Sequence, residues 1–113
     1  MLTLENLRSF GADTASGLER CMGMEALYLR LVNMAKDEKN FDLLSDALNS
    51  GDLDAAFSAA HALKGVLGNL SLTPMYDIAT EITELLRAKS QTDYSPYLEK
   101  LLELRERLRE ICA

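Results

Sequence analysis

The pattern of apolar and polar residues along the chain predicts helices. Apolar residues recur every three or four positions, the spacing that places them on one face of an α-helix. The clearest stripe belongs to the C-terminal segment and consists of Tyr97, Leu101, Leu104, Leu108 and Ile111. No segment shows a convincing alternation with a period of two, which a half-buried strand would require. The sequence therefore predicts an all-α protein.

The four longest predicted helices are expected to form a bundle. They span residues 24–50, 52–71, 73–89 and 95–112. The first could be kinked near Asp37, where the polar stretch "KDEKN" interrupts its apolar stripe. Short connections between helices of similar length favour an antiparallel up-down four-helix bundle. Two shorter helices, around residues 3–10 and 13–21, would pack across one end, and we expect residues 1–113 to form one domain.

Residues that favour helix ends mark the starts of three bundle helices. Gly51 should terminate the first bundle helix, and Asp52 should cap the N-terminus of the second. Thr73 and Ser95 are the expected N-caps of the third and fourth helices, each followed by a proline at the first helical position.

The charge balance narrows the range of partners. The chain has 18 acidic and 12 basic residues, a net charge of −6, which disfavours nucleic-acid binding. No apolar run approaches the ~20 residues of a membrane span, and the N-terminus "MLTLENLRSF" lacks the basic and apolar regions of a signal peptide. We therefore expect a soluble, cytoplasmic monomer that binds neither nucleic acid nor membranes.

The cysteine and histidine content disfavours a metal site. Cys21 and Cys112 are far apart in the sequence, and His61 is the only histidine, which leaves too few ligands for a Cys/His zinc site. Buried or half-buried free thiols are the expected state of both cysteines.

The helix that contains His61 has two distinct faces. Successive residues of an α-helix turn by about 100°, so the side opposite His61 carries an apolar stripe that should face the core. This stripe consists of Ala55, Ala56, Ala59, Leu63, Val66, Leu67 and Leu70. His61 should therefore point into solvent.

The outer face around His61 departs from an ordinary solvated surface. Its members are Asp54, Phe57, Ser58, Lys64, Gly65 and Gly68. A glycine inside a helix costs about 0.5–1 kcal/mol relative to alanine, and two of them here would clear the surface so that a partner can approach the imidazole. Phe57 is either exposed for a partner or folded back on the core edge. Asp54 and Ser58 are interpreted as helix surface that a partner could also touch.

Two kinds of chemistry are conceivable for this face. Ser58, Asp54 and His61 superficially resemble a catalytic triad, but acyl transfer needs a pocket with an oxyanion hole, which one convex helix does not supply. An accessible neutral imidazole can itself accept a phosphoryl group on a ring nitrogen, with the metal and the positioning supplied by a partner. Lys64 could offset part of the added negative charge. We favour the second interpretation.

The stretch "HALKGVLGNLSL", with its core motif at residues 61–70, resembles the signature of histidine-containing phosphotransfer (HPt) domains. The likeness extends from about residue 50 to residue 89, whereas the other helices agree only in pattern. One departure is Ser71, which stands where the family usually has glycine. We expect it to adjust the turn after the helix without abolishing transfer.

The resemblance implies a four-helix bundle and a role in phosphorelay signalling. His61 would exchange a phosphoryl group with the aspartate of a response-regulator receiver domain or a hybrid histidine kinase, with Lys64 as an electrostatic helper and Gly65 providing access. Phe57, Ser58, Asp54 and Gly68 would contact the partner. The resemblance implies no cofactor in this chain and Mg²⁺ on the receiver. Such a chain would be a phosphoryl carrier with a phosphohistidine intermediate, not a stand-alone enzyme; the alternative is a bundle that docks receivers without being phosphorylated.

Overall fold

The computed structural model describes residues 1–113 and contains seven α-helices and no strands. The helices are α1 (Leu4–Phe10), α2 (Thr14–Arg20), α3 (Glu25–Ala35), α4 (Asn40–Ser50), α5 (Leu53–Asn69), α6 (Thr73–Arg87) and α7 (Ser95–Cys112). The predictions of an all-α chain and of two short N-terminal helices are confirmed. None of the helices is long and apolar enough to cross a bilayer.

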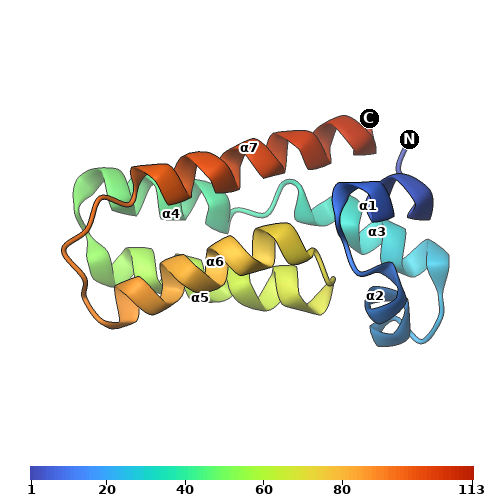
Figure 1. Ribbon diagram of the computed structural model, residues 1–113, viewed down its shortest axis with the longest axis horizontal. Helices are drawn as coiled ribbons and strands as arrows, with labels where there is room; N and C mark the ends of the chain where they lie inside the picture. The colour runs from blue at the N-terminus through green and yellow to red at the C-terminus, as the bar shows by residue number, and fades with distance from the viewer.

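Helices α4 to α7 pack antiparallel as a bundle, and α1, α2 and α3 gather at one end of it (Figure 1). The molecule is elongated, with extents of 41 × 24 × 19 Å. Helix α7 runs along much of its length and reaches α1, and the two termini lie side by side because the Met1 amino group donates a hydrogen bond to the carbonyl oxygen of Ala113. The predicted bundle with short helices at one end is confirmed.

The first bundle helix is interrupted where the sequence suggested a kink. Helix α3 ends at Ala35 and α4 begins at Asn40, so the predicted helix over residues 24–50 is two helices. The interruption is held by α7, because the Arg105 Nε group donates to the carbonyl oxygen of Lys36 over 3.1 Å, and Arg109 pairs with Asp37 over 3.2 Å. Arg105, although charged, is almost fully buried there. Side-chain donors from α7 thus take over part of the hydrogen bonding that an uninterrupted helix would provide.

Helix ends follow the sequence signals in two cases and shift by one residue in two. Gly51 ends α4 as predicted, with a left-handed φ angle of 76°. Asp52 caps α5 as predicted, because its carboxylate accepts a hydrogen bond of 3.1 Å from the Ala55 N–H. Thr73 and Ser95 are not N-caps, contrary to the prediction, but the first helical residues of α6 and α7. The Thr73 hydroxyl donates to the carbonyl oxygen of Ser71, outside the helix, and therefore does not accept from the first turn of α6.

A core of 25 buried apolar residues runs through the bundle and continues into the N-terminal helices. Its largest fully buried side chains are Tyr28, Phe41, Leu7, Leu44, Leu63, Leu67, Leu72, Met75, Ile82, Leu101, Leu108 and Val32. Both cysteines are free, with Cys21 buried and Cys112 half-buried, as predicted. The shared core means that α1 to α3 pack as part of the same body as the bundle, which places them within reach of α5.

Candidate functional site

Helix α5 presents His61 to solvent and turns its opposite side to the core. The imidazole is exposed, as predicted, and Ala56, Ala59, Leu63, Leu67 and Leu70 on the other side are buried. Two edge positions differ from the prediction: Ala55 is exposed and Ala60 is fully buried. On the helical wheel Ala55 lies about 120° from His61 and Ala60 about 100° from it, on the opposite side. Both positions are at the margins of the apolar stripe, where the packing of neighbouring helices decides which residue is buried.

Phe57 and His61 stack on each other one turn apart on α5. Their ring centroids are 5.8 Å apart and the ring planes differ by 23°, within the range of favourable aromatic pairs. Arg87 of α6 places its guanidinium carbon 5.2 Å from the centroid of the Phe57 ring. Phe57 is half-buried and packs against the core, so of the two alternatives it lies at the core edge while still touching the imidazole. The ring of His61 is thereby supported on one side and open on the other.

The two glycines beside His61 have different surroundings. A Cβ atom placed on Gly65 would meet nothing within 4 Å, which leaves open space next to the imidazole. A Cβ atom on Gly68 would lie 2.9 Å from the Tyr76 ring of α6. The missing side chain of Gly68 therefore makes room for Tyr76, whereas that of Gly65 leaves the surface free.

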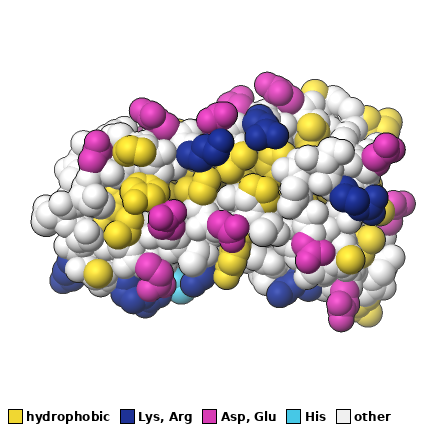
Figure 2. All heavy atoms as spheres, viewed as in Figure 1, with side chains coloured by type: hydrophobic (Ala, Val, Ile, Leu, Met, Phe, Trp, Pro, Cys, Tyr) yellow, Lys and Arg dark blue, Asp and Glu magenta, His cyan; other side chains and the backbone are white.

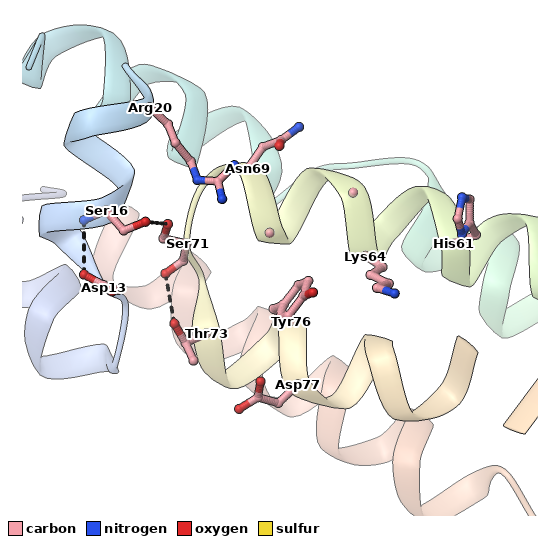
Figure 3. A pocket seen from close by; sticks show the side chains of 12 residues that line it. Asp13, Ser16, Arg20, His61, Lys64, Asn69, Ser71, Thr73, Tyr76 and Asp77 are labelled. Carbon is pink, nitrogen blue, oxygen red and sulfur yellow. Dashed lines mark hydrogen bonds between the residues drawn. The ribbon is translucent and has the colours of Figure 1, made fainter. Parts of the chain in front are cut away.

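An open groove of about 530 Å³ adjoins the imidazole, although the convex face of α5 suggested no concavity there. Its floor and walls come from α5, from the start of α6 and from α2 with the residue that precedes it (Figure 3). Apart from Tyr76, the lining residues are polar, charged or glycine. The lining consists of Asp13, Ser16, Arg20, His61, Lys64, Gly65, Gly68, Asn69, Ser71, Thr73, Tyr76 and Asp77. The groove joins His61 to a wall that belongs to the N-terminal part of the chain.

The charges near His61 are more favourable to an anion than the net charge suggests. Lys64 is half-buried and takes part in no ion pair, and its side chain points towards α6 in Figure 3. Arg87 adds a second positive charge through its contact with Phe57, although it also pairs with Glu84 over 3.4 Å. In Figure 2 the histidine lies at the surface between patches of Lys and Arg side chains. Lys64 and Arg87 thus place positive charge close to His61 on a chain whose net charge is −6, although the groove itself also contains the carboxylates of Asp13 and Asp77.

Asp54 and Ser58 lie exposed on α5 and do not form a catalytic arrangement with His61. No hydrogen bond connects either side chain to the imidazole, and neither residue lines the groove. A hydrolytic triad needs a nucleophile, a base and an orienting acid linked by hydrogen bonds. The geometry therefore lends the acyl-transfer interpretation no support, and both residues are part of the outer surface of α5.

Ser71 adopts the backbone conformation for which glycine is the usual residue. Its φ angle is +53°, in the left-handed region, and its N–H donates to the carbonyl oxygen of Gly68. The turn is tied to the N-terminal helices: the Asp13 N–H donates to the Ser71 carbonyl oxygen over 3.0 Å, and the Ser71 hydroxyl donates to Ser16 Oγ over 3.1 Å. As expected, serine is accommodated at the end of the helix, and its hydroxyl gains a partner that glycine would lack.

Tyr28 of α3 bonds to the turn after α5 from inside the core. Its hydroxyl donates a hydrogen bond of 2.8 Å to the carbonyl oxygen of Leu70. Burial, together with the nearby Cys21 and Asp13, raises the pKa of Tyr28 from 10.0 to about 12, so the phenol remains a proton donor at alkaline pH as well. Gly17 of α2 makes this packing feasible, because a Cβ atom there would lie 2.3 Å from the Tyr28 ring.

The residues near the site that were not anticipated from the sequence include Ser16, Arg20, Asn69, Tyr76 and Arg87. Asn69 had a usable signal, since it lies about 80° from His61 on the helical wheel of α5. The others come from α2 and α6, and nothing in their local sequence indicates that they lie beside the α5 surface. They become neighbours of the site only through tertiary packing.

Comparison with known proteins agrees with this geometry. No curated protein and no solved structure shows significant similarity to the chain. The family model described as "Hpt domain" matches residues 38–112, which contain α4 to α7 and the whole signature around His61. Proteins of this family take part in phosphorelays together with receiver domains and histidine kinases. Since the match covers well over half of the sequence, the chain belongs to the Hpt domain family.

Proposed function

We propose that His61 of this protein accepts a phosphoryl group from the phosphoaspartate of a receiver domain and passes it to another receiver. The observation that carries the proposal is the combination of an exposed imidazole with open space at Gly65, on the helix that holds the family signature. An imidazole in this setting can be approached in line by a group held on another protein. The docking surface would include the exposed or half-exposed outer positions of α5, namely Asp54, Phe57, Ser58 and Gly68.

In the transfer step the imidazole of His61 is the nucleophile. The lone pair of a neutral ring nitrogen attacks the phosphorus, a P–N bond forms, and the P–O bond to the aspartate breaks with its electron pair left on the carboxylate. The ring proton on the other nitrogen is then free to leave for solvent. The phosphoryl charge is spread over three oxygens during transfer, and Lys64, which has no acidic partner in the structure, is available to stabilise it. Mg²⁺ would be bound by the receiver, not by this chain.

The role of Phe57 in this step would be to hold the imidazole. Stacking at 5.8 Å would favour one orientation of the His61 ring, and a nucleophile that is already oriented loses less entropy when the donor docks. The protein would act as a carrier in the cytoplasm, where free thiols such as Cys21 and Cys112 stay reduced.

The test is a label-transfer experiment with purified receiver domains from the same cell. Each receiver is phosphorylated with labelled acetyl phosphate and mixed with the wild-type protein or with His61→Gln. We expect label on the wild type only, labile in acid and stable in base, as a phosphohistidine is. If a receiver binds the folded protein but none transfers label, the proposal is wrong and the protein is a docking module that is not phosphorylated.

A further inference from the structure

We infer that helix α2 is part of the surface that docks the receiver domain, and that Arg20 on it forms an ion pair with an acidic side chain of that receiver. This inference rests on the proposed function. Helix α2 lies outside residues 38–112, the part of the chain that matches the family. It nevertheless forms one wall of the groove whose other end is His61. A partner that reaches His61 along this groove meets α2.

The position of α2 is set firmly enough for it to act as part of a docking surface. Its start is tied to the turn after α5 by the Asp13–Ser71 and Ser16–Ser71 hydrogen bonds. The ring of Tyr28, which itself bonds to the Leu70 carbonyl oxygen, packs directly against Gly17. A contact residue on a pre-organised element loses little conformational freedom when a partner binds. Arg20 therefore projects from a scaffold that is already in place before docking.

Arg20 lies within the area that a partner centred on His61 would cover. Asn69, which lines the groove together with Arg20, follows His61 by eight residues on α5, an axial distance of about 12 Å. A standard interface buries about 800 Å² on each partner, a patch roughly 30 Å across. In Figure 3 Arg20, Asn69 and His61 project to the same side of α5. A receiver seated over the imidazole would thus extend over Arg20.

The charge of Arg20 is available to a partner. The side chain is exposed and takes part in no ion pair or hydrogen bond within the protein. Of the two carboxylates in the groove, Asp13 accepts from the Ser16 N–H over 3.1 Å at the start of α2, and Asp77 is exposed on α6 (Figure 3). Arg20 and Lys64 are the two cations of the groove, and neither is neutralised.

Charge complementarity argues for an acidic counterpart on the receiver. The donor group is a phosphoaspartate, so the surface that approaches His61 is anionic at its centre, whereas this chain has a net charge of −6 and repels it as a whole. A cation at each end of the groove offsets that repulsion locally. A charge at the edge of an interface acts mainly on the association rate and on its salt dependence. If Arg20 pairs with the receiver, replacing it should therefore change the rate of association and the effect of salt on that rate.

The experiment compares Arg20→Glu with Arg8→Glu. Arg8 is a matched control: like Arg20 it is exposed, unpaired and in the last turn of a seven-residue helix, but it does not line the groove. The probe is the receiver that labels wild-type His61 fastest, phosphorylated with acetyl phosphate. We expect Arg20→Glu to lower kcat/KM for transfer about three- to tenfold at low salt, through KM, and the difference to shrink at high salt. Arg8→Glu should transfer like the wild type, and Arg20→Lys should retain most of the rate.

The outcomes separate this inference from the proposed function. Equal rates and equal salt dependence for Arg20→Glu and Arg8→Glu, with normal transfer by the wild type, would overturn the role of Arg20 and leave the carrier function intact. No label on the wild type from any receiver would remove both. Urea unfolding of the two variants checks that a rate difference does not reflect lost stability, since both changes place the same charge at a helix C-terminus.

Discussion

The two ends of the groove on α5 are built in opposite ways. At the His61 end the side chain of Lys64 has no partner and the space beside Gly65 is empty. At the other end, the turn after α5 is bonded to α2 and α3 through Asp13, Ser16 and Tyr28. At the His61 end the charged and open groups remain available to a partner protein, whereas at the other end the polar groups are already bonded within the fold. Substitutions at the two ends should therefore affect different measurements, transfer at the first and stability at the second.

The strongest test of this division is Gly65→Gln, for which we expect a large loss of transfer without a loss of stability. The new side chain would stand one turn from His61, in space that a Cβ atom alone leaves open. Displacing the donor by an ångström or more costs on the order of a hundredfold in rate, whereas replacing a helical glycine stabilises α5 by up to ~1 kcal/mol. Label transfer and urea unfolding measure the two effects. Transfer at the wild-type rate would mean that Gly65 serves some purpose other than access.

At the end of the groove near α2, Gly17→Ala should have the reverse effect, a loss of stability. The added Cβ atom would lie 2.3 Å from the ring of Tyr28, which is fully buried and cannot move aside cheaply. Overpacking of this kind costs about 1–3 kcal/mol. The matched control is Gly65→Ala, where the same added methyl group meets open space and should stabilise the protein. If both alanine variants had the same free energy of unfolding, the packing of α2 on Tyr28 would not be as the structure describes.

The smallest expected effect is that of Tyr28→Phe, which removes one hydrogen bond and one titrating group. Loss of the donor to the buried Leu70 carbonyl oxygen should lower the free energy of unfolding by about 1–2 kcal/mol at neutral pH. The folded state holds the Tyr28 proton more tightly than the unfolded state, since the pKa is raised from 10.0 to about 12. Wild-type stability contributed by this proton is therefore complete below pH 10 and declines as the pH rises towards 12.

Urea unfolding of the wild type and of Tyr28→Phe between pH 8 and pH 11 measures this effect. Both proteins contain three further tyrosines, so the informative quantity is the difference between their slopes above pH 10. A steeper decline for the wild type is the expected result. Parallel curves would show that the Tyr28 phenol is not held in its protonated form by the fold.

The pair Gly65 and Gly68 shows how far local sequence reasoning reaches. Both glycines lie on the outer face of α5 within two turns of His61, and the sequence assigns both the same role of clearing a path to the imidazole. The structure separates them, because the space at Gly68 is taken by Tyr76 of α6, eight residues further along the chain. Nothing in the α5 sequence distinguishes the two, since the difference depends on a side chain contributed by another helix.

The interruption between α3 and α4 is a similar case. The polar stretch after Ala35 indicated a weak point in the helix, but not that Arg105, 69 positions away, bonds through its Nε to the Lys36 carbonyl oxygen at the break. The groove depends in the same way on α2, which residues 14–20 alone do not place next to α5. Ser71, in contrast, could be placed from the sequence: it was expected in the turn after the His61 helix, and it lies there with a φ angle of +53°.

By itself the sequence determined the helices of this protein, the outward direction of His61 and the apolar side of α5. These depend on periodicity and on residues within one turn of each other, and such short-range preferences are contained in any segment of the chain. Only the tertiary structure decided that Gly68 accommodates Tyr76, that Arg105 bonds to the break in the first bundle helix, and that α2 forms a wall of the groove beside His61. Each of these depends on contacts between residues distant in sequence, which form because burying the shared core brings separate helices together.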